Sequence, residues 1–489
     1  MSHKYKTSKY QQAIYTWVKE GSGNAVIQAV AGSGKTSTIV EATKLIPVDK
    51  KCCFVAFNKA IADELKEKVP KHVEARTLHS LGLSFFKSNG YNPQVDSSKV
   101  HKLVESEIED VDANIRGDYY MFLKKIIPNI KNTLIDYTNL EQIESVKERF
   151  GINDEVDDRM MLSIRRIMEK NNKDMTTIDF DDMIYLPVIN NLTNGVYDWV
   201  LVDESQDLNR TQFELIKRVC DKHTRVIAVG DKRQSIYAFR GADINSMDNF
   251  RTEFNAVELP LSICYRCPKS HILLAQEIVP EIEASDFAEE GIIEDVNLLD
   301  AIEKANDKDL ILCRTNAPLI KVAFALIRNG KKAIIRGKDI GANLIKMIEK
   351  YKAKDLGDLY VKLEAFRKLN DDKLMLIEKG KFDSKKKNSL LTNIDCVDTI
   401  FAVMEECDTI EEVKTKIQNI FTDEKEGIIC SSVHRAKGLQ SDGVFIVNRD
   451  RMPHPMAKTD EEIEQEFNIL YVALTRSKHA LYMIKETIQ

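Results

Sequence analysis

The run QAVAGSGKTST at residues 28–38 constrains the fold of this chain more than any other part of the sequence. An apolar stretch, AVIQAV at residues 25–30, leads into a glycine-rich turn, and a helical pattern follows. Small residues let successive backbone N–H groups surround phosphate oxygens at the start of a helix. The run therefore predicts a buried strand, a phosphate loop and a helix, the repeating unit of α/β folds.

The phosphate loop has Ala29 at its first position, where Gly is usual, and otherwise matches the expected pattern. Lys35 is expected to reach the β- and γ-phosphates of ATP, and the Thr36 hydroxyl is expected to bind Mg²⁺. The alternative is a glycine-rich turn without a ligand, but GSGKT directly after a strand favours the phosphate loop. The predicted ATP-binding residues of this loop are Ala29, Val30, Ala31, Gly32, Ser33, Gly34, Lys35 and Thr36.

A second part of the ATP site is predicted at VLVDESQD, residues 200–207. An apolar strand ends there in two adjacent carboxylates, and open α/β sheets bind ligands beyond the carboxyl ends of their strands. Asp203 is expected to bind Mg²⁺ together with Thr36, and Glu204 is expected to orient or deprotonate the attacking water. An acidic pair at a strand end can also be a solvated turn, but the preceding phosphate loop favours the metal site.

Short apolar runs that end in polar or glycine-containing turns indicate buried parallel strands in two groups. They lie at 25–30, 52–57, 199–202 and 225–229, and then at 310–313, 333–336, 443–447 and 480–484. We therefore predict an α/β fold with two parallel-sheet domains, each with a helical insertion. The first domain is expected at 1–85 and 176–262 with an all-helical insertion at 86–175, and the second at 263–340 and 427–489 with a small helical insertion at 341–426.

The overall charge does not by itself indicate a nucleic-acid partner. The 489 residues have a net charge of −6, so a nucleic-acid binder would need its Lys and Arg gathered in a groove. No second Cys pair or His pair follows Cys264 and Cys267, which favours buried reduced thiols over a zinc site. The sequence has no apolar signal core and no apolar stretch long enough for a membrane span. We expect a soluble cytoplasmic protein, nucleoid-associated if it is bacterial or phage-encoded.

Two further runs, DESQD (203–207) and GDKRQSIYAFRGA (230–242), resemble motifs II and III of superfamily 1A helicases of the UvrD/Rep type. Other runs resemble the remaining motifs of that family in the same order along the chain. The Q motif is matched by YQQAI around Gln11, motif Ia by FNKAIADEL (57–65), Ib by TLHSLG (77–82), IV by CYRCP (264–268), V by VHRAKGLQ (433–440) and VI by YVALTRSK (471–478). Motifs Ia and VI, and the run IDFDDMI (178–184), are similar in style to the F-box DNA helicase branch and compact phage-type relatives.

The resemblance implies a role for each matching residue of the nucleotide site. Gln11 would hydrogen-bond the adenine, Tyr265 would stack on it, and Gln234 would sense the γ-phosphate. Gly438 and Gln440 would also contact the nucleotide. The implied catalytic residues are Lys35, Asp203, Glu204, Gln234, Arg266 and Arg476.

Arg266 and Arg476 would meet the γ-phosphate from the second domain. Guanidinium groups suit the charge that spreads over phosphoryl oxygens during transfer. Because these arginines would come from the second domain, hydrolysis would depend on closure of the cleft between the two domains. A surface salt bridge is the alternative for each arginine, and the surrounding motifs favour the catalytic role.

The track for a single strand is implied to consist of aromatic and polar side chains. Aromatic rings stack on any base, and polar side chains bind phosphates without reading the sequence. The alternative is that Tyr237 and Phe239 are core aromatics and that His79 is a core histidine; the motifs favour DNA contact. The implied DNA-binding residues are Phe57, Asn58, Thr77, His79, Tyr237, Phe239, Arg240 and His434.

The chain departs from the family pattern in a few places. Motif V ends in Gln440 and Ser441 rather than in Glu and an aromatic residue, which is expected to tune nucleotide affinity. Motif III has Phe239 where Trp is common. Only residues 477–489 follow Arg476, so the strand-separating hairpin of larger relatives is expected to lie elsewhere or to be absent.

The implied function is that of an ATP-dependent single-stranded DNA translocase and 3′→5′ DNA helicase. ATP hydrolysis in the cleft between two RecA-like domains would drive movement along DNA and duplex unwinding. One alternative is a translocase that displaces proteins from single strands with little unwinding. Another is an ATP-binding scaffold subunit, which the intact catalytic residues disfavour. The expected partners are single-stranded DNA and single–double-strand junctions, together with replication or recombination proteins. A monomer without membrane contact is expected.

Overall fold

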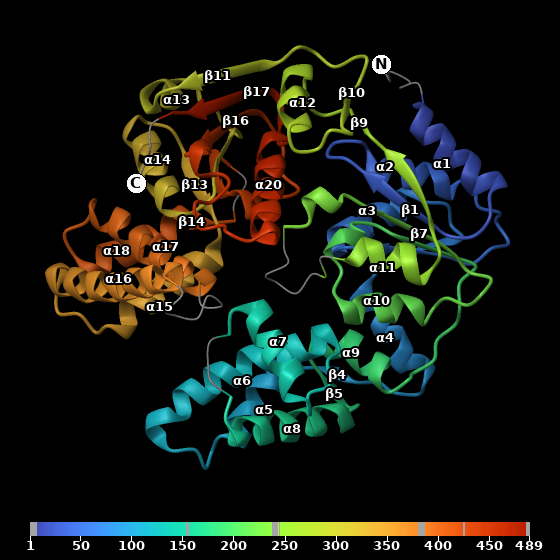
Figure 1. The fold of residues 1–489 in the computed structure, drawn as a ribbon, viewed down its shortest axis with the longest axis horizontal. Coiled ribbons are helices and arrows are strands. Elements are labelled where there is room, and N and C mark those ends of the chain that lie inside the picture. Colours follow the sequence, from blue (N-terminus) through green and yellow to red (C-terminus); the bar gives the residue numbers. More distant parts are fainter. Residues whose placement is uncertain are drawn as a thin grey trace. The chain divides into compact units, whose positions relative to one another are not determined.

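The computed structural model describes residues 7–152, 156–236, 243, 245–379, 387–423 and 426–485. The chain divides into two compact units, Met1–Ser262 (unit 1) and Ile263–Gln489 (unit 2). Each unit is built on a parallel sheet with helices packed against it, as Figure 1 shows. This confirms the predicted α/β fold with parallel sheets.

The sheet of unit 1 has the strand order β3-β2-β6-β7-β1-β8, and all its pairings are parallel. Its strands are β1 (Ala25–Ala29), β2 (Cys52–Ala56), β3 (Val73–Thr77), β6 (Trp199–Val202), β7 (Arg225–Gly230) and β8 (Val257–Leu261). The helices near this sheet are α1 (Lys9–Glu20), α2 (Lys35–Thr43), α3 (Lys59–Lys68), α4 (Leu78–Ser88), α9 (Asp182–Ile189), α10 (Arg210–Lys217) and α11 (Ser246–Glu253).

Both faces of this sheet are buried, as the apolar runs of the sequence require. Trp199 and Leu201 of β6 belong to the core that contains side chains of α1, α2 and α3. Val200 and Val202 point to the other face and belong to a core shared with α4, α9 and α10. Because strand side chains alternate between faces, one short apolar run stabilises two layers of helices.

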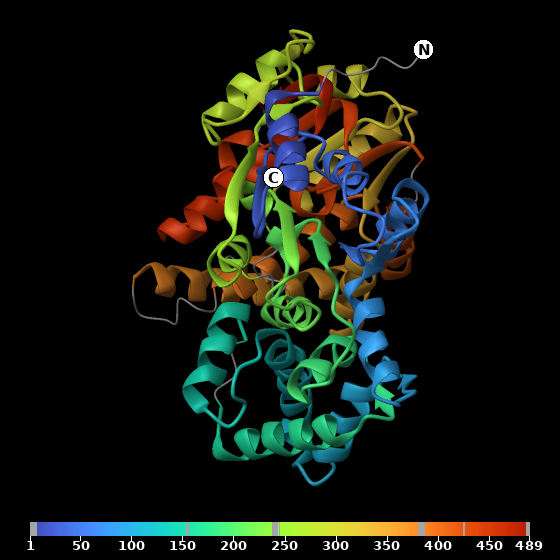
Figure 2. The same cartoon turned by 90° about the vertical axis from the view of Figure 1, so that its right-hand side faces the viewer.

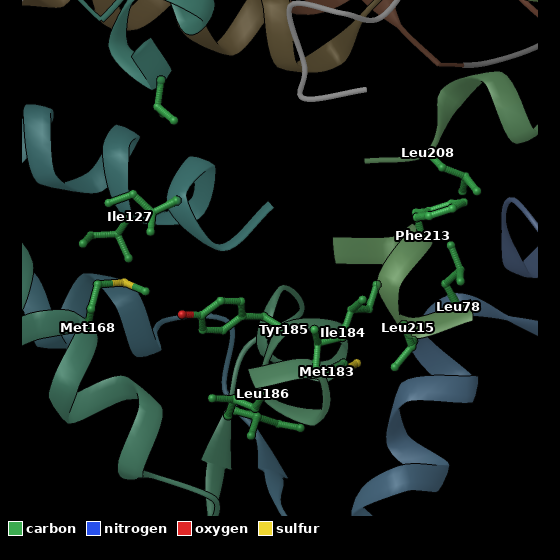
Figure 3. Close-up of a cluster of buried hydrophobic side chains, with 14 of the residues drawn as sticks. Leu78, Ile127, Met168, Met183, Ile184, Tyr185, Leu186, Leu208, Phe213 and Leu215 are labelled. Atoms are coloured by element: carbon green, nitrogen blue, oxygen red, sulfur yellow. The ribbon is translucent and has the colours of Figure 1, made fainter. Parts of the chain in front are cut away.

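The first helical stretch lies on the side of α4, α9 and α10 that faces away from the sheet (Figure 2). Its elements are β4 (Gln94–Val95), α5 (Lys99–Glu107), α6 (Ala113–Thr133), α7 (Leu140–Phe150) and α8 (Asp158–Lys173), and β5 (Thr177–Ile178) follows. Figure 3 shows Ile184 and Tyr185 of α9 between Ile127 of α6 on one side and Phe213 of α10 on the other. The expectation of an all-helical insertion was wrong in one detail, because β4 pairs with β5.

Buried ion pairs also connect this stretch to the rest of unit 1. The Lys131 ammonium of α6 lies 2.8 Å from carboxylate oxygens of both Asp179 and Asp182. Lys99 of α5 lies 2.8 Å from Asp182. Burial alone would raise the pKa of Asp182, but Lys131 and Lys99 outweigh it and lower that pKa. A buried charge is tolerated when it is paired in this way.

The sheet of unit 2 has the order β11-β17-β16-β12-β15-β13-β14, and its pairings are also parallel. Its strands are β11 (Ile292–Val296), β12 (Leu310–Cys313), β13 (Ala333–Arg336), β14 (Phe421–Thr422), β15 (Ile428–Ser432), β16 (Ser441–Val447) and β17 (Ser477–Ile484). The short strands β9 (Ile263–Cys264) and β10 (Glu283–Ala284) pair separately. The helices are α12 (Lys269–Gln276), α13 (Leu298–Lys304), α14 (Ala317–Arg328), α15 (Lys338–Lys350), α16 (Leu356–Glu378), α17 (Lys387–Met404), α18 (Ile410–Ile420), α19 (Val433–Ala436) and α20 (Asp460–Leu474).

The second helical stretch shares the core of this sheet. Leu363 of α16 and Ile400 of α17 belong to the same apolar cluster as Ile335 of β13. The Asp395 carboxylate of α17 accepts the backbone N–H groups of Asn316 and Ala317 at 3.0 and 3.2 Å, so it caps the start of α14. The stretch also contributes β14 to the sheet, which the prediction of helices alone did not include.

Candidate nucleotide site and nucleic-acid interface

The predicted site residues of unit 1 gather at one edge of its sheet. The strands are parallel, so their carboxyl ends meet at the same edge. The phosphate loop follows β1, the acidic pair follows β6, and Gln234 follows β7; these strands are neighbours. Phe57 follows β2 and His79 comes after β3, further along the same edge. The topology therefore places a candidate nucleotide site beside a candidate strand site.

The phosphate loop has the backbone conformation that its glycines allow. Gly32 and Gly34 have φ values of 68° and 77°, in the left-handed region that favours glycine. Gly34 is the N-cap of α2, so the first N–H groups of that helix point into the loop. The Ser33 hydroxyl is buried and has no hydrogen-bond partner among the described residues. Open N–H groups and an unsatisfied hydroxyl fit a phosphate group.

The acidic pair lies directly against the phosphate loop. The Thr36 hydroxyl donates to Asp203 Oδ2 at 2.8 Å, and Lys35 Nζ lies 3.8 Å from Glu204 Oε2. Burial, and then the neighbouring Glu204, raise the pKa of Asp203 to about 6. Glu204 is itself in the left-handed region, at φ 50° and ψ 41°, a strained conformation typical of functional sites.

A magnesium ion fits this donor set. Thr36 and Asp203 present adjacent hard oxygen donors, and Mg²⁺ is usually bound by one or two carboxylates together with substrate phosphates. The raised pKa of Asp203 indicates that its charge is poorly compensated by the protein alone. Within the described ranges, no group of three or more His, Cys, Asp or Glu side chains could hold a metal.

Gln234 is positioned by the first residues after β7. Its amide donates to Asp231 Oδ2 at 2.5 Å, and its backbone N–H donates to the Asp231 carbonyl at 2.8 Å. Burial raises the pKa of Asp231. The predicted strand contacts Tyr237, Phe239 and Arg240 come next along the chain and lie outside the described residues.

Gln11 lies at the start of α1, close to the phosphate-loop helix. Its side chain and that of Ser8 form a capping box at this helix end. The Gln11 amide also donates to the Thr38 hydroxyl of α2 at 3.1 Å. Since an amide has two donors and two acceptor lone pairs, it keeps capacity for an adenine ring.

The strand candidates of unit 1 combine exposure with local structural roles. Phe57 is 49% exposed, directly after β2. Asn58 caps α3 by accepting the Ile61 N–H, and Thr77 caps α4 by accepting the Ser80 N–H. His79 is partly buried, which lowers the pKa of its imidazole and favours the neutral form.

The predicted arginines of unit 2 lie close together. The Arg266 guanidinium donates to the Thr475 carbonyl at 3.1 Å. Arg476 is only 1% exposed; its Nε donates to the Val472 carbonyl at 2.8 Å, and its Nη1 donates to the Leu439 carbonyl at 3.3 Å. The structure thus places motifs IV, V and VI together. Arg476 donates to a backbone carbonyl of motif VI and to one of motif V.

The remaining predicted residues of unit 2 lie in motifs IV and V. Tyr265 is partly buried beside Arg266, His434 is partly buried in α19, and Gln440 is exposed before β16. Gly438 has a φ of 87°, in the left-handed region that favours glycine, and a side chain there would meet open space. The positive φ, rather than crowding, accounts for glycine at this position.

Comparison with known proteins agrees with this geometry. A family model described as the UvrD/REP helicase N-terminal domain matches residues 9–255. A model described as the UvrD-like helicase C-terminal domain matches residues 427–484. The chain belongs to the UvrD/Rep helicase family.

Several curated relatives are similar to this UvrD/Rep-family chain. The F-box DNA helicase protein 1 of Schizosaccharomyces pombe is 25% identical, over 94% of this chain and 55% of the relative. A probable DNA helicase II homolog of Mycoplasma genitalium is 23% identical, over 95% of this chain and 83% of the relative. The ATP-dependent DNA helicase Rep of Buchnera aphidicola is 30% identical, over 48% of this chain and 37% of the relative. The chain therefore spans about half the length of the first of these relatives.

The structure adds one aromatic residue to the strand candidates of this UvrD/Rep-family chain. Phe180 is 57% exposed, and its ring centroid lies 6.0 Å from that of His79 in an edge-to-face arrangement. The IDFDDMI run resembles the family, but no site residue was predicted within it. The sequence signal that could have identified Phe180 is its position between two aspartates, where an aromatic side chain is not expected to be buried.

Two findings concern the cysteines and membrane-spanning helices. All nine cysteines are free thiols, and Cys264 and Cys267 are buried, as expected. The Cys267 backbone N–H donates to Cys264 Sγ at 3.4 Å. In the part of the chain that the structure describes, no helix is long and apolar enough to cross a membrane.

Proposed function

We propose that this protein is an ATP-dependent single-stranded DNA translocase and a 3′→5′ DNA helicase. The observation that supports this most strongly is the arrangement of one sheet edge in unit 1. Phosphate loop, acidic pair and Gln234 follow β1, β6 and β7, and exposed or half-exposed aromatic side chains follow β2 and β3 on the same edge. Membership in the UvrD/Rep family fits both halves of this arrangement.

In this proposal, the phosphate loop binds the triphosphate of ATP. The N–H groups at the start of α2 and the Lys35 ammonium bind phosphate oxygens. Thr36 and Asp203 would hold Mg²⁺, which would neutralise charge on the phosphates. Glu204 orients the attacking water or accepts its proton, and Gln234 responds to the γ-phosphate. Gln11 binds the adenine.

The arginines of unit 2 complete this chemistry in the proposal. Arg266 and Arg476 stabilise the charge that develops on the phosphoryl group, and Tyr265 stacks on the adenine. Gly438 and Gln440 contact the nucleotide. Because the residues come from both units, hydrolysis requires the two units together, and this dependence couples chemistry to movement.

The strand track is proposed to run over the aromatic side chains of unit 1. Phe57 and Phe180 offer exposed rings on which bases can stack, and His79 packs against Phe180. Asn58, Thr77 and His434 bind phosphates. Such contacts do not depend on base identity, which a motor needs. The 3′→5′ direction, the preference for DNA junctions and the role in replication, repair or recombination follow from the resemblance.

The test is steady-state ATPase activity of the full chain with and without single-stranded DNA. We expect strong stimulation by a single-stranded oligonucleotide, and we expect Lys35→Ala to abolish it. Phe180→Ala should weaken strand binding and raise the DNA concentration that gives half-maximal stimulation. Unwinding is then compared on duplexes with a 3′ tail or a 5′ tail. ATP hydrolysis that is indifferent to DNA would contradict the strand track, and unwinding only with a 5′ tail would contradict the polarity.

A further inference from the structure

Gln206 is a buried side chain between the acidic pair and the residues after β7, and no role has so far been given to it. It is 2% exposed and lies in the short 3₁₀ turn Ser205–Asp207. Its Nε2 donates to Glu204 Oε2 at 2.5 Å, and its Oε1 accepts the Asp231 backbone N–H at 3.1 Å. These partners fix the orientation of the amide, because a carboxylate can only accept and a backbone N–H can only donate.

The hydrogen bonds continue from Asp231 to Gln234. Asp231 Oδ1 accepts the Arg233 N–H at 3.1 Å, and its Oδ2 accepts the Gln234 amide at 2.5 Å. A continuous chain of bonded groups therefore leads from the proposed general base, Glu204, through Gln206 and Asp231 to the proposed γ-phosphate sensor. It joins the ends of β6 and β7, which are neighbours in the sheet.

The space for this amide depends on a glycine. A Cβ added to Gly230 would overlap Gln206 Oε1 and would lie 2.9 Å from Ser205 Oγ and from Met247 Sδ. All these atoms lie in a closely packed part of unit 1, so they cannot move apart without disturbing the turn. Any side chain at position 230 would therefore displace the Gln206 amide. This crowding is a second indication, independent of the hydrogen bonds, that the amide has one defined position.

The position of Glu204 makes such support necessary. Its backbone is in the left-handed region, a conformation that surrounding contacts must stabilise. Its carboxylate oxygen Oε2 bonds to Gln206 and lies 3.8 Å from Lys35 Nζ. Without the Gln206 amide, the Glu204 side chain would sample more rotamers, and misplacement of a catalytic group by about 1 Å can cost about 100-fold in rate.

We propose that Gln206 is a positioning residue for ATP hydrolysis. It holds the Glu204 carboxylate in the orientation that the attacking water needs and connects it to Asp231 and Gln234, without touching the nucleotide itself. This inference rests on the proposed ATP hydrolysis at the same site. It adds the physical connection between the base and the residues that follow β7.

The experiment compares Gln206→Leu and Gln206→Glu with the wild-type full chain. For Gln206→Leu, we expect kcat of the DNA-stimulated ATPase to fall about 100-fold, with KM for ATP within about threefold of wild type. For Gln206→Glu, the amide donor to Glu204 is lost as well, so kcat should fall to a similar extent while KM for ATP again stays within about threefold of wild type. A purely structural role would not separate kcat from KM in this way.

The matched control is Gln212→Leu. Gln212 lies in the first turn of α10, shortly after Gln206 in the chain. Its side chain forms the capping box at the start of that helix. This variant should lose some thermal stability and keep the wild-type kcat. Gly230→Ala should resemble Gln206→Leu, and combining the two should lower kcat no further than either alone, because both act through the same amide.

The outcomes separate this inference from the proposed function. A wild-type chain that hydrolyses no ATP overturns both proposals. A hydrolysing wild type with Gln206→Leu within about twofold of its kcat overturns only the role of Gln206. A Gln206→Glu variant that is folded by thermal melting and keeps kcat within about twofold of wild type overturns it as well.

Discussion

The two units of the chain differ most in the charge that their candidate site residues present. In unit 1, carboxylates gather at the strand ends: Asp203 and Asp231 are buried, and burial raises the pKa of both. In unit 2, the site is formed by arginines, and Arg476 donates to backbone carbonyls in its own unit. Both sets stand on parallel sheets with helices against them.

Under the proposed function, this difference means that the two similar sheets would supply complementary parts of one reaction. The carboxylates of unit 1 are poorly compensated by the protein alone, so they are suited to a cation and to proton transfer. Two backbone carbonyls of its own unit hold the Arg476 guanidinium in place, so it presents a positioned positive charge at little reorganisation cost. Three changes test this contrast.

The largest effect is expected for Glu204→Gln in unit 1. Loss of the proposed base should lower kcat of the DNA-stimulated ATPase about 1000-fold, while ATP binding remains because the phosphate loop is intact. Glu214→Gln, a substitution of the same kind in a surface ion pair of α10, is the control and should keep the wild-type rate. Activity of Glu204→Gln near that of wild type would remove Glu204 from the mechanism.

A smaller effect is expected for Arg476→Lys in unit 2. Lysine keeps the charge but cannot bond two backbone carbonyls in the same geometry, so kcat should fall about 100-fold. The affinity for ADP, which lacks a γ-phosphate, should stay within about threefold. Arg328→Lys, at an exposed arginine paired with Glu406, should behave as wild type. If ADP affinity falls together with kcat, Arg476 serves the structure of the site rather than the γ-phosphate.

The smallest effect is a gain in stability for Asp203→Asn. The pKa of Asp203 is raised to about 6 by burial, so its charged form costs stability above that pH, by an amount on the order of 1–3 kcal/mol. The neutral amide removes this cost. Chemical unfolding in EDTA should therefore show the variant more stable at pH 7 and the difference shrinking as pH falls towards 4. If the variant is instead less stable at pH 7, the claim that the charged Asp203 carboxylate destabilises the folded protein is wrong.

Much of the fold followed from apolar runs that are buried on both faces. The predicted strands at 25–30, 199–202 and 310–313 correspond to β1, β6 and β12. In unit 1 the prediction missed the edge strands β3 and β8, and in unit 2 it missed β11, β14 and the central strand β15. The sequences of β3 and β8, VEART and VELPL, contain exposed charges or a proline, as edge strands often do.

The candidate site was predictable where local sequence determines geometry. Glycines 32 and 34 have the positive φ values that a phosphate loop needs. The contact between Thr36 and Asp203, 167 positions apart, was expected because both residues match motifs of the nucleotide site, not because of local geometry. Gln206 and Phe180 were not predicted, because their roles depend on neighbours brought together by the sheet. The burial of Arg476 among backbone carbonyls depends on the packing of α20 against the loop before β16, which no local pattern encodes.

The most direct test of the motor is displacement of streptavidin from biotinylated single-stranded DNA. The full chain is mixed with ATP, Mg²⁺ and oligonucleotides that carry biotin at the 5′ or the 3′ end, with Lys35→Ala as the inactive control. A 3′→5′ translocase should release streptavidin rapidly from the 5′ end and leave the 3′ end unaffected. No ATP-dependent release from either end, by a chain whose ATPase is active, would contradict the account.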